Sequence, residues 1–161
     1  MNKRISIIIL FVVVLLVPND ANSLSWTGDF SKSSLIGIKS IQLNINAEQI
    51  STLNEDNIIN DIKLKLLNSK IKVDKLSRSI LGIRIYLEEE TMSKLLVYQL
   101  QVSLFQTSRL LRNNAKIISI TWHDFESGIV GNKKVDTLRD RLKDLLDGFI
   151  IDYLIANPVK L

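Results

Sequence analysis

The sequence predicts an α+β domain, a two-layer sandwich in which a mostly antiparallel sheet of four to five strands carries two helices on one face. Several segments alternate between apolar and polar residues, which is typical of strands with one buried face. Two other segments have helical spacing, and together the elements follow the order β-α-β-β-β-β-α. Short polar turns join consecutive strands, which favours antiparallel pairing. We expect one domain over residues 35–161.

The first half of the domain is expected to contain two strands and a helix. Residues 38–46 alternate between apolar and polar, which predicts the first strand. Thr52 and Glu55 fit a capping box, in which each side chain bonds a backbone N–H at the helix start. Apolar residues then recur at helical spacing to about residue 67. Residues 70–73 predict a short second strand.

The second half is expected to contain the longer strands, at residues 80–88, 94–107 and 115–125. In the last of them, Ile118, Ile120 and Trp122 share one parity and are expected to face the core. Ser119 and Thr121 have the other parity and are expected to face solvent.

A loop and a long helix complete the predicted domain. Residues 126–133 include Gly128 and Gly131 and predict a flexible loop with glycines at positive φ. Residues 134–156 carry apolar residues at i, i+3 and i+7, which predicts an amphipathic helix. Pro158 ends it, because a residue before proline is disfavoured in helical geometry.

The N-terminal segment has the layout of a secretory signal peptide. Lys3 and Arg4 precede an apolar run of 13 residues, 5–17, and residues 21–23 offer small side chains for cleavage after position 23. The run would span about 20 Å, short of the roughly 30 Å hydrocarbon core of a membrane. We therefore expect residues 1–23 to be removed on export, with a retained anchor as the alternative.

The expected mature chain begins with a polar, flexible leader at residues 24–34. It contains no second apolar run long enough to predict a transmembrane segment. Export predicts a periplasmic location, with an extracellular one as the alternative.

Composition excludes several chemistries. The chain has no Cys, which excludes disulfides, thiolate metal sites, a Cys nucleophile and a lipid-modified N-terminal Cys. Its single His excludes a site with two His ligands. The formal net charge is +4, and losing Lys3, Arg4 and Asp20 with the signal peptide lowers it to +3. That charge is too small to indicate a nucleic-acid partner, and no cofactor is expected.

The end of the chain resembles a group of uncharacterised exported bacterial proteins. Residues 149–158 read FIIDYLIANP, a form of the pattern FIxDYLxANP, and Trp122 and the Gly128–Gly131 segment extend the resemblance over most of residues 36–158. More loosely, the layout is similar to the lipopolysaccharide-assembly lipoprotein of Gram-negative outer membranes and to the N-terminal domain of the periplasmic Tol–Pal translocation protein. These resemblances imply a periplasmic interaction module. The missing Cys departs from the lipoprotein pattern, so outer-membrane anchoring does not follow.

Three motifs resemble sites of known chemistry, and none predicts a catalytic or metal site. His123 and Asp124 are neighbours in a strand and point to opposite faces, so the carboxylate cannot orient the imidazole. Three glutamates at residues 88–90 could hold a hard cation, but solvated charge is typical of a hairpin tip. The glycines at 128 and 131 precede a helix, but lack the third glycine of a phosphate-binding turn.

A basic cluster is the strongest candidate site. Six cations fall within 16 residues and are opposed only by Asp74: Lys63, Lys65, Lys70, Lys72, Lys75 and Arg78. Such a surface could bind an anionic lipid headgroup or a phosphorylated glycan. The alternative is that solvated lysines protect a short edge strand from pairing with another chain.

The sheet face without helices is the second candidate surface. Its expected residues are Gln42, Asn44, Arg84, Tyr86, Gln99, Gln101, Ser103, Ser119 and Thr121. We therefore predict a non-catalytic exported binding or assembly module of the bacterial cell envelope, whose partner is an envelope protein or an anionic lipid or glycan. A carrier that holds a small or lipidic anionic ligand between sheet and helices is one alternative, and an unrecognised enzyme is another.

Overall fold

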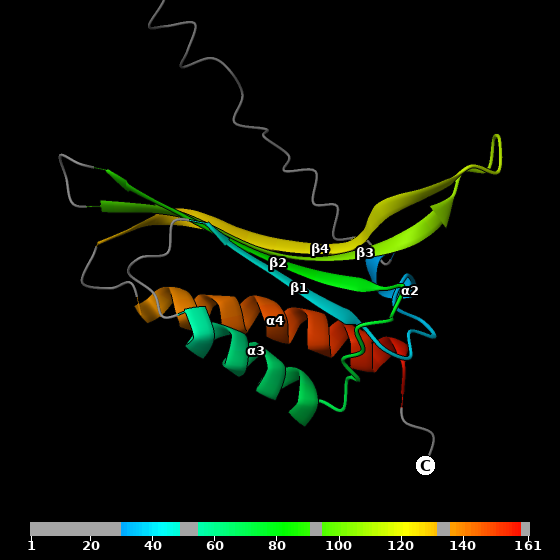
Figure 1. Cartoon of the computed structure of the whole chain (residues 1–161), viewed down its shortest axis with the longest axis horizontal. Coiled ribbons are helices and arrows are strands. Elements are labelled where there is room, and N and C mark those ends of the chain that lie inside the picture. The colour runs from blue at the N-terminus through cyan, green and yellow to red at the C-terminus, as the bar shows by residue number, and fades with distance from the viewer. Residues whose placement is uncertain (1–29, 49–54, 91–94, 132–135, 159–161) are drawn as a thin grey trace, which may run out of the picture.

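The computed structural model describes residues 30–48, 55–90, 95–131 and 136–158. The elements are α2 (Phe30–Ser33), β1 (Gln42–Glu48), α3 (Glu55–Asn68), β2 (Ile80–Glu90), β3 (Leu95–Arg109), β4 (Lys116–Gly131) and α4 (Asp136–Ala156). The predicted fold class is confirmed, since α3 and α4 lie on one face of a four-stranded, mostly antiparallel sheet (Figure 1). The predicted signal peptide, most of the predicted leader and the Thr52 cap lie outside the described residues.

The strands lie in the order β1-β2-β3-β4. The β2–β3 and β3–β4 pairs are antiparallel, whereas β1 and β2 are parallel because α3 connects them as a crossover. The predicted strand at residues 70–73 is reduced to a single bridge between Val73 and Ile41. Apart from the short helix α2, the order of the described elements is therefore β-α-β-β-β-α. It has one strand fewer than the predicted order β-α-β-β-β-β-α.

The end of α3 explains why that short strand does not form. The N–H of Ile71 donates to the carbonyl of Leu66 at 3.0 Å, and the N–H of Lys70 donates to that of Leu67 at 2.9 Å. This is a Schellman motif, and it places Lys70 at φ 59 in the left-handed region. The chain is thus still turning at residue 70, which leaves too few extended residues for a strand.

A bulge in the β3–β4 pair changes the faces of β4. Trp122 pairs with Leu104, but Ile120 pairs with Phe105, so Thr121 is an extra residue on β4. A bulge leaves one residue unpaired, bends the strand and increases its twist. Residues on the two sides of Thr121 consequently follow opposite parities.

The prediction that Ile118 and Ile120 face the core is therefore wrong. Ile118 is 72% exposed and Ile120 is 51% exposed, whereas Trp122, beyond the bulge, is buried as predicted. Ser119, predicted to face solvent, is half-buried. Its hydroxyl is hydrogen-bonded to that of Ser108 on the neighbouring strand.

The predicted loop with glycines at positive φ is also wrong in its first part. β4 continues to Gly131, so Gly128 is a strand residue that pairs with Tyr98. Among the described glycines, only Gly37 has a positive φ. The role of Gly128 is to make room for the Tyr98 ring, as discussed below.

One core fills the space between the sheet and the two long helices. Four of its α4 residues were predicted and are buried: Leu138, Leu142, Leu145 and Phe149. The ring of Phe149 contacts that of Trp122 edge to face, with centroids 5.2 Å apart. The hydroxyl of Tyr153 donates to the carbonyl of Ile38 at 2.8 Å, and burial raises the pKa of this phenol, which keeps it protonated as a donor.

The short helix α2 falls within the predicted leader and packs on the domain. Lys32 lies 3.3 Å from Asp152 of α4, and the hydroxyl of Ser34 donates to the carbonyl of Thr121 at 2.8 Å. Leu35, two residues after the end of α2, is fully buried. Residues 30–34 are therefore part of the folded body. In the portion of the chain that the structure describes, no helix is long and apolar enough to cross a membrane.

Candidate anion-binding site

Two of the six predicted cluster cations are engaged in contacts within the protein. The ammonium of Lys65 donates to the carboxylate of Asp147 at 2.5 Å and to the carbonyl of Lys143 at 3.0 Å. Lys72 lies 3.5 Å from Asp74, whose backbone hydrogen bond from Leu76 and proximity to Lys72 lower the pKa of its carboxyl. Lys65 thus ties α3 to α4 and does not face a ligand.

Three other members of the cluster, Lys63, Lys70 and Lys75, are exposed. The described residues supply no ion-pair partner for them. The sixth, Arg78, lies apart from α3 at the entry to β2, where it lines a polar cleft. The structure therefore distributes the predicted cluster over several surfaces.

The cleft has a volume of about 370 Å³ and is formed by seven residues of three segments: Arg78, Ser79, Gln106, Thr107, Ser108, Arg109 and Lys116. Three of these are exposed cations and none is acidic. Arg78, Arg109 and Lys116 have no ion-pair partner among the residues that the structure describes. The cleft is thus a concave surface with three uncompensated positive charges.

The cleft forms because β3 and β4 are longer than β2. β2 begins at Ile80, which pairs with Phe105, so residues 106–109 of β3 have no neighbour on that side except the incoming chain at residues 78–79. The bulge at Thr121 adds bend and twist at the same level. Figure 1 shows the far end of the β3–β4 hairpin bending away from the helices.

Polar side chains of the cleft are held by hydrogen bonds. The amide nitrogen of Gln106 donates to the hydroxyl of Ser79 at 3.4 Å, and its oxygen accepts from the hydroxyl of Thr121 at 2.5 Å. The Ser108 hydroxyl is bonded to that of Ser119. These bonds fix the floor of the cleft, while the cations at its rim remain available to an anion.

Sequence reasoning found Arg78 but missed the other two cations. A signal was present, because residues 91–123 contain no Asp or Glu and four basic residues, which are Lys94, Arg109, Arg112 and Lys116. These cations are spread over more than 20 positions and form no run. They come near Arg78 only through strand pairing.

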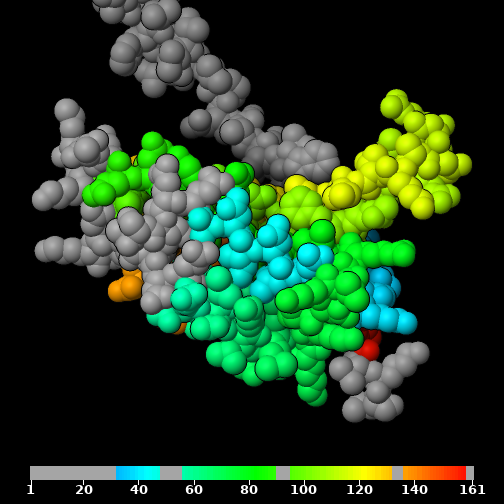
Figure 2. All heavy atoms as spheres, viewed as in Figure 1, coloured from blue at the N-terminus to red at the C-terminus, as the bar shows by residue number. Residues whose placement is uncertain are grey.

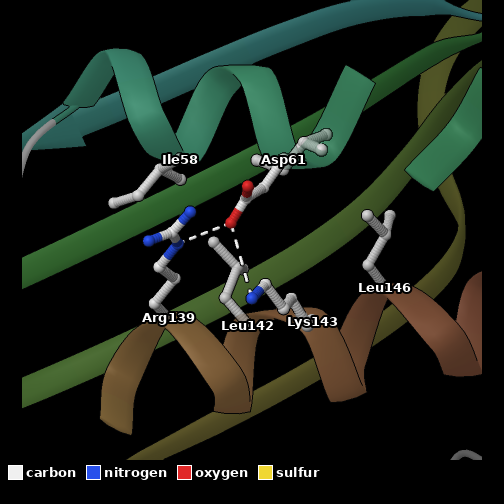
Figure 3. A pocket seen from close by; sticks show the side chains of 7 residues that line it. Ile58, Asp61, Arg139, Leu142, Lys143 and Leu146 are labelled. Atoms are coloured by element: carbon white, nitrogen blue, oxygen red, sulfur yellow. Dashed lines mark hydrogen bonds and ion pairs between the residues drawn. The ribbon is translucent and has the colours of Figure 1, made fainter. Parts of the chain in front are cut away.

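A second group of charges lies between the two long helices. Asp61 of α3 points toward Arg139 and Lys143 of α4 (Figure 3), with oxygen–nitrogen distances of 2.5 and 3.5 Å. Its hydrogen bond from Arg139 lowers the pKa of the carboxyl, while desolvation opposes that shift. The apolar hollow beside these charges has a volume of only about 10 Å³, room for about one water. The ion pairs of Asp61 with Arg139 and Lys143 form a clasp between the two helices. The hollow beside this clasp is too small to hold the small or lipidic ligand that the carrier alternative requires.

The clasp predicts an acid-dependent contribution to stability. Because the folded protein lowers the pKa of Asp61 below its usual 3.8, the contribution is present above that value and is lost as the pH falls through the lowered pKa. Asp61→Asn should therefore lower the free energy of unfolding by about 1 kcal/mol at neutral pH, because ion pairs between partly exposed side chains contribute little more than this to stability. The difference between wild type and variant, measured by urea unfolding, should vanish in strong acid.

Asp140→Asn is the matched control for that measurement. Asp140 also lies 3.5 Å from Lys143, but its side chain is 77% exposed. Its removal should change stability little at any pH. A pH-independent loss in the Asp61 variant would show that the carboxyl acts by packing alone.

The helix-free face of the sheet only partly matches its prediction. Arg84 and Gln99 are exposed, while Tyr86 and Gln101 are half-buried. The prediction that Ser103 faces solvent is wrong, since it is 1% exposed. Several apolar side chains are exposed on this face or along β4, namely Val97, Ile118, Ile120, Phe125 and Ile129.

Ser103 and His123 form a contact that the sequence did not predict. The hydroxyl lies 3.0 Å from Nδ1 of His123 and accepts from the amide of Gln101 at 2.9 Å. The imidazole stacks on the ring of Phe125, with centroids 5.4 Å apart. Because the Ser103 hydroxyl is buried, a substrate carbonyl cannot reach it. Asp124 follows His123 in the strand and lies on the opposite face, so the three side chains do not form a triad.

The glutamates at the end of β2 form no described metal site. The hydroxyl of Tyr86 donates to Glu88 at 2.8 Å. Within the described ranges, no three residues of the types His, Cys, Asp and Glu come close enough to hold a metal.

Comparisons with known proteins give no family. No family model and no curated protein matches the chain. Among solved structures, the fold is similar to that of a minor lipoprotein from Acinetobacter baumannii, with 14% identity and a TM-score of 0.32 over 75% of this chain and 92% of the other. A likeness this distant indicates nothing about function.

Proposed function

We propose that the protein is a non-catalytic exported module of the bacterial cell envelope, and that it binds a phosphate-bearing anion in the cleft between Arg78 and the β3–β4 hairpin. The supporting observation is the convergence of Arg78, Arg109 and Lys116 on one polar cleft without an acidic lining residue. Export is inferred from residues 1–23.

The chemistry of the lining suits an anion of high charge density such as phosphate. Two guanidinium groups can each donate two parallel hydrogen bonds to phosphate oxygens, and the ammonium of Lys116 supplies a third positive charge. Hydroxyls on the floor offer further donors of lower strength. An anion carrying more than one negative charge therefore finds both charge and directional donors in the cleft.

Inorganic pyrophosphate is a suitable probe, because it carries this chemistry without a lipid or a sugar. Calorimetric titration of the full chain at low salt should show binding that weakens as salt is added, since the cations are exposed. Removing Arg109 and Lys116 together, as Arg109→Gln and Lys116→Gln, should weaken binding by at least about tenfold, because hydrogen bonds to charged groups are the stronger class.

The matched control removes the same charge elsewhere. Lys63→Gln with Lys70→Gln neutralises two exposed cations of the cluster predicted from sequence and leaves the cleft intact. Its affinity for pyrophosphate should stay close to that of the wild type. A loss confined to the control pair would assign binding to the predicted cluster and contradict the cleft, and equal losses would indicate attraction by net charge alone.

A further inference from the structure

We propose that the tip of the β3–β4 hairpin inserts Leu111 into the surface of an anionic lipid membrane while the cations of the cleft bind headgroup phosphates. The inference rests on the proposed anion-binding function, since it names a lipid headgroup as the source of the phosphate.

The tip presents an apolar side chain in a fixed loop. Leu111 is fully exposed. The loop is closed by a hydrogen bond from the N–H of Leu110 to the carbonyl of Ala115 at 2.9 Å, and the N–H of Asn114 donates to the carbonyl of Leu110 at 2.8 Å. Asn114 takes φ 56, a left-handed conformation that asparagine tolerates. Backbone bonds thus hold the turn that carries the exposed Leu111 side chain.

Basic residues lie on both sides of this apolar tip in the chain. Arg109, Arg112 and Lys116 belong to the hairpin, and Arg78 lines the same cleft as Arg109 and Lys116. Close to Arg78 in the chain, Leu76 is 91% exposed. Interfacial helices bind anionic membranes by the same combination of apolar side chains that enter the bilayer surface and basic side chains that attract its headgroups. The absence of acidic residues from position 91 to 123 selects an anionic surface over a neutral one.

The geometry of the hairpin allows the tip to reach a flat surface. β2 begins at Ile80, which pairs with Phe105 of β3. Residues 106–109 of β3 and their partners on β4 extend past this pair. Figures 1 and 2 show this end of the hairpin projecting from the body, on the side away from α3 and α4. Leu111 can therefore enter a bilayer surface without any rearrangement of the fold.

The absence of Cys from the chain makes the test specific. Leu111→Cys in the full chain can be labelled with the environment-sensitive fluorophore NBD and mixed with phosphatidylcholine vesicles with or without phosphatidylglycerol. We expect a several-fold rise in emission with the anionic vesicles only, and quenching by nitroxide-labelled lipid. Because this readout is local to residue 111, attachment through the N-terminal apolar segment does not produce it.

Leu67→Cys is the matched control. Leu67 is also an exposed leucine, at 69%, but it lies on α3, on the opposite side of the sheet. A label there should stay in water with both kinds of vesicle. In the labelled Leu111→Cys background, Arg112→Gln should raise the lipid concentration at half-maximal emission about fivefold, the contribution of one basic residue near an anionic surface.

The outcomes separate this inference from the proposed function. Pyrophosphate binding by the Leu111→Cys variant without an emission change on vesicles would overturn insertion and leave anion binding in place. If the wild type does not bind pyrophosphate and the Leu111 label shows no emission change on anionic vesicles, both proposals are overturned. Equal emission changes with neutral and anionic vesicles, or at Leu67 and Leu111, would also overturn the inference.

Discussion

Phe149→Ala should lower the free energy of unfolding by about 3–5 kcal/mol, the range for truncating a buried aromatic side chain. Phe149 is fully buried and contacts the rings of Trp122 and Tyr153, with centroids 5.2 and 6.2 Å away. Both neighbours are tied by hydrogen bonds, Trp122 to Asp152 and Tyr153 to the carbonyl of Ile38. They cannot collapse into the space left by the ring, so the cost should fall in the upper part of the range.

Urea unfolding of the full chain measures this loss, and Ile151→Ala is its control. Ile151 lies on the same helix, two residues away, but is 55% exposed. Its truncation should change the free energy of unfolding by about 1 kcal/mol or less, as for most surface positions. Similar losses in the two variants would mean that α4 does not pack on the sheet through its Phe149 stripe.

Gly128→Ala should lower the free energy of unfolding by about 1–3 kcal/mol, the cost of overpacking a filled site. Gly128 pairs directly with Tyr98, and a Cβ placed on it would lie 2.8 Å from the Tyr98 oxygen and 3.0 Å from Cζ. The aromatic ring covers the cross-strand glycine and fills the space that its missing side chain leaves.

The Tyr98 ring has little freedom to move aside. It is 4% exposed, and its hydroxyl donates to the carboxylate of Glu126 at 2.8 Å. Arg141, which also bonds Glu126, lies 5.6 Å from the ring centroid. Burial, together with the hydrogen bond to Glu126, raises the pKa of Tyr98, so the phenol remains a donor at neutral pH.

Gly131→Ala is the matched control for the Gly128 substitution. Both glycines lie on β4, but nothing lies within 4 Å of a Cβ built on Gly131. That change should be neutral or slightly stabilising, because alanine reduces the conformational entropy of the unfolded chain. A neutral Gly128 variant would contradict the close contact with Tyr98.

The candidate site shows how far local sequence reasoning reaches. The basic cluster was recognisable because its six cations are near one another in the chain, yet helix geometry and local pairing direct Lys65 and Lys72 to acidic partners. The cleft instead combines Arg78, just before β2, with Arg109 of β3 and Lys116 of β4. Separation along the chain hid this group.

Local residue patterns were enough to predict the two layers and most of the core. Period-two alternation in the strands and helical spacing in α3 and α4 depend only on neighbouring residues, and they correctly predicted which side of each helix is buried. The absence of Cys and the single His likewise restrict the chemistry without any knowledge of the fold.

The register of the strands, in contrast, depends on contacts between segments that are distant in the chain. Because Thr121 is an extra residue, the β4 residues that precede it in the chain face the opposite way from what alternation predicts. Because β2 begins opposite Phe105, the end of the β3–β4 hairpin is left free to form the cleft. Both features arise from pairing between distant segments. The alternation of apolar and polar residues within one strand does not depend on which residue of the neighbouring strand each one pairs with. Register and bulges therefore follow from the packing of the whole sheet.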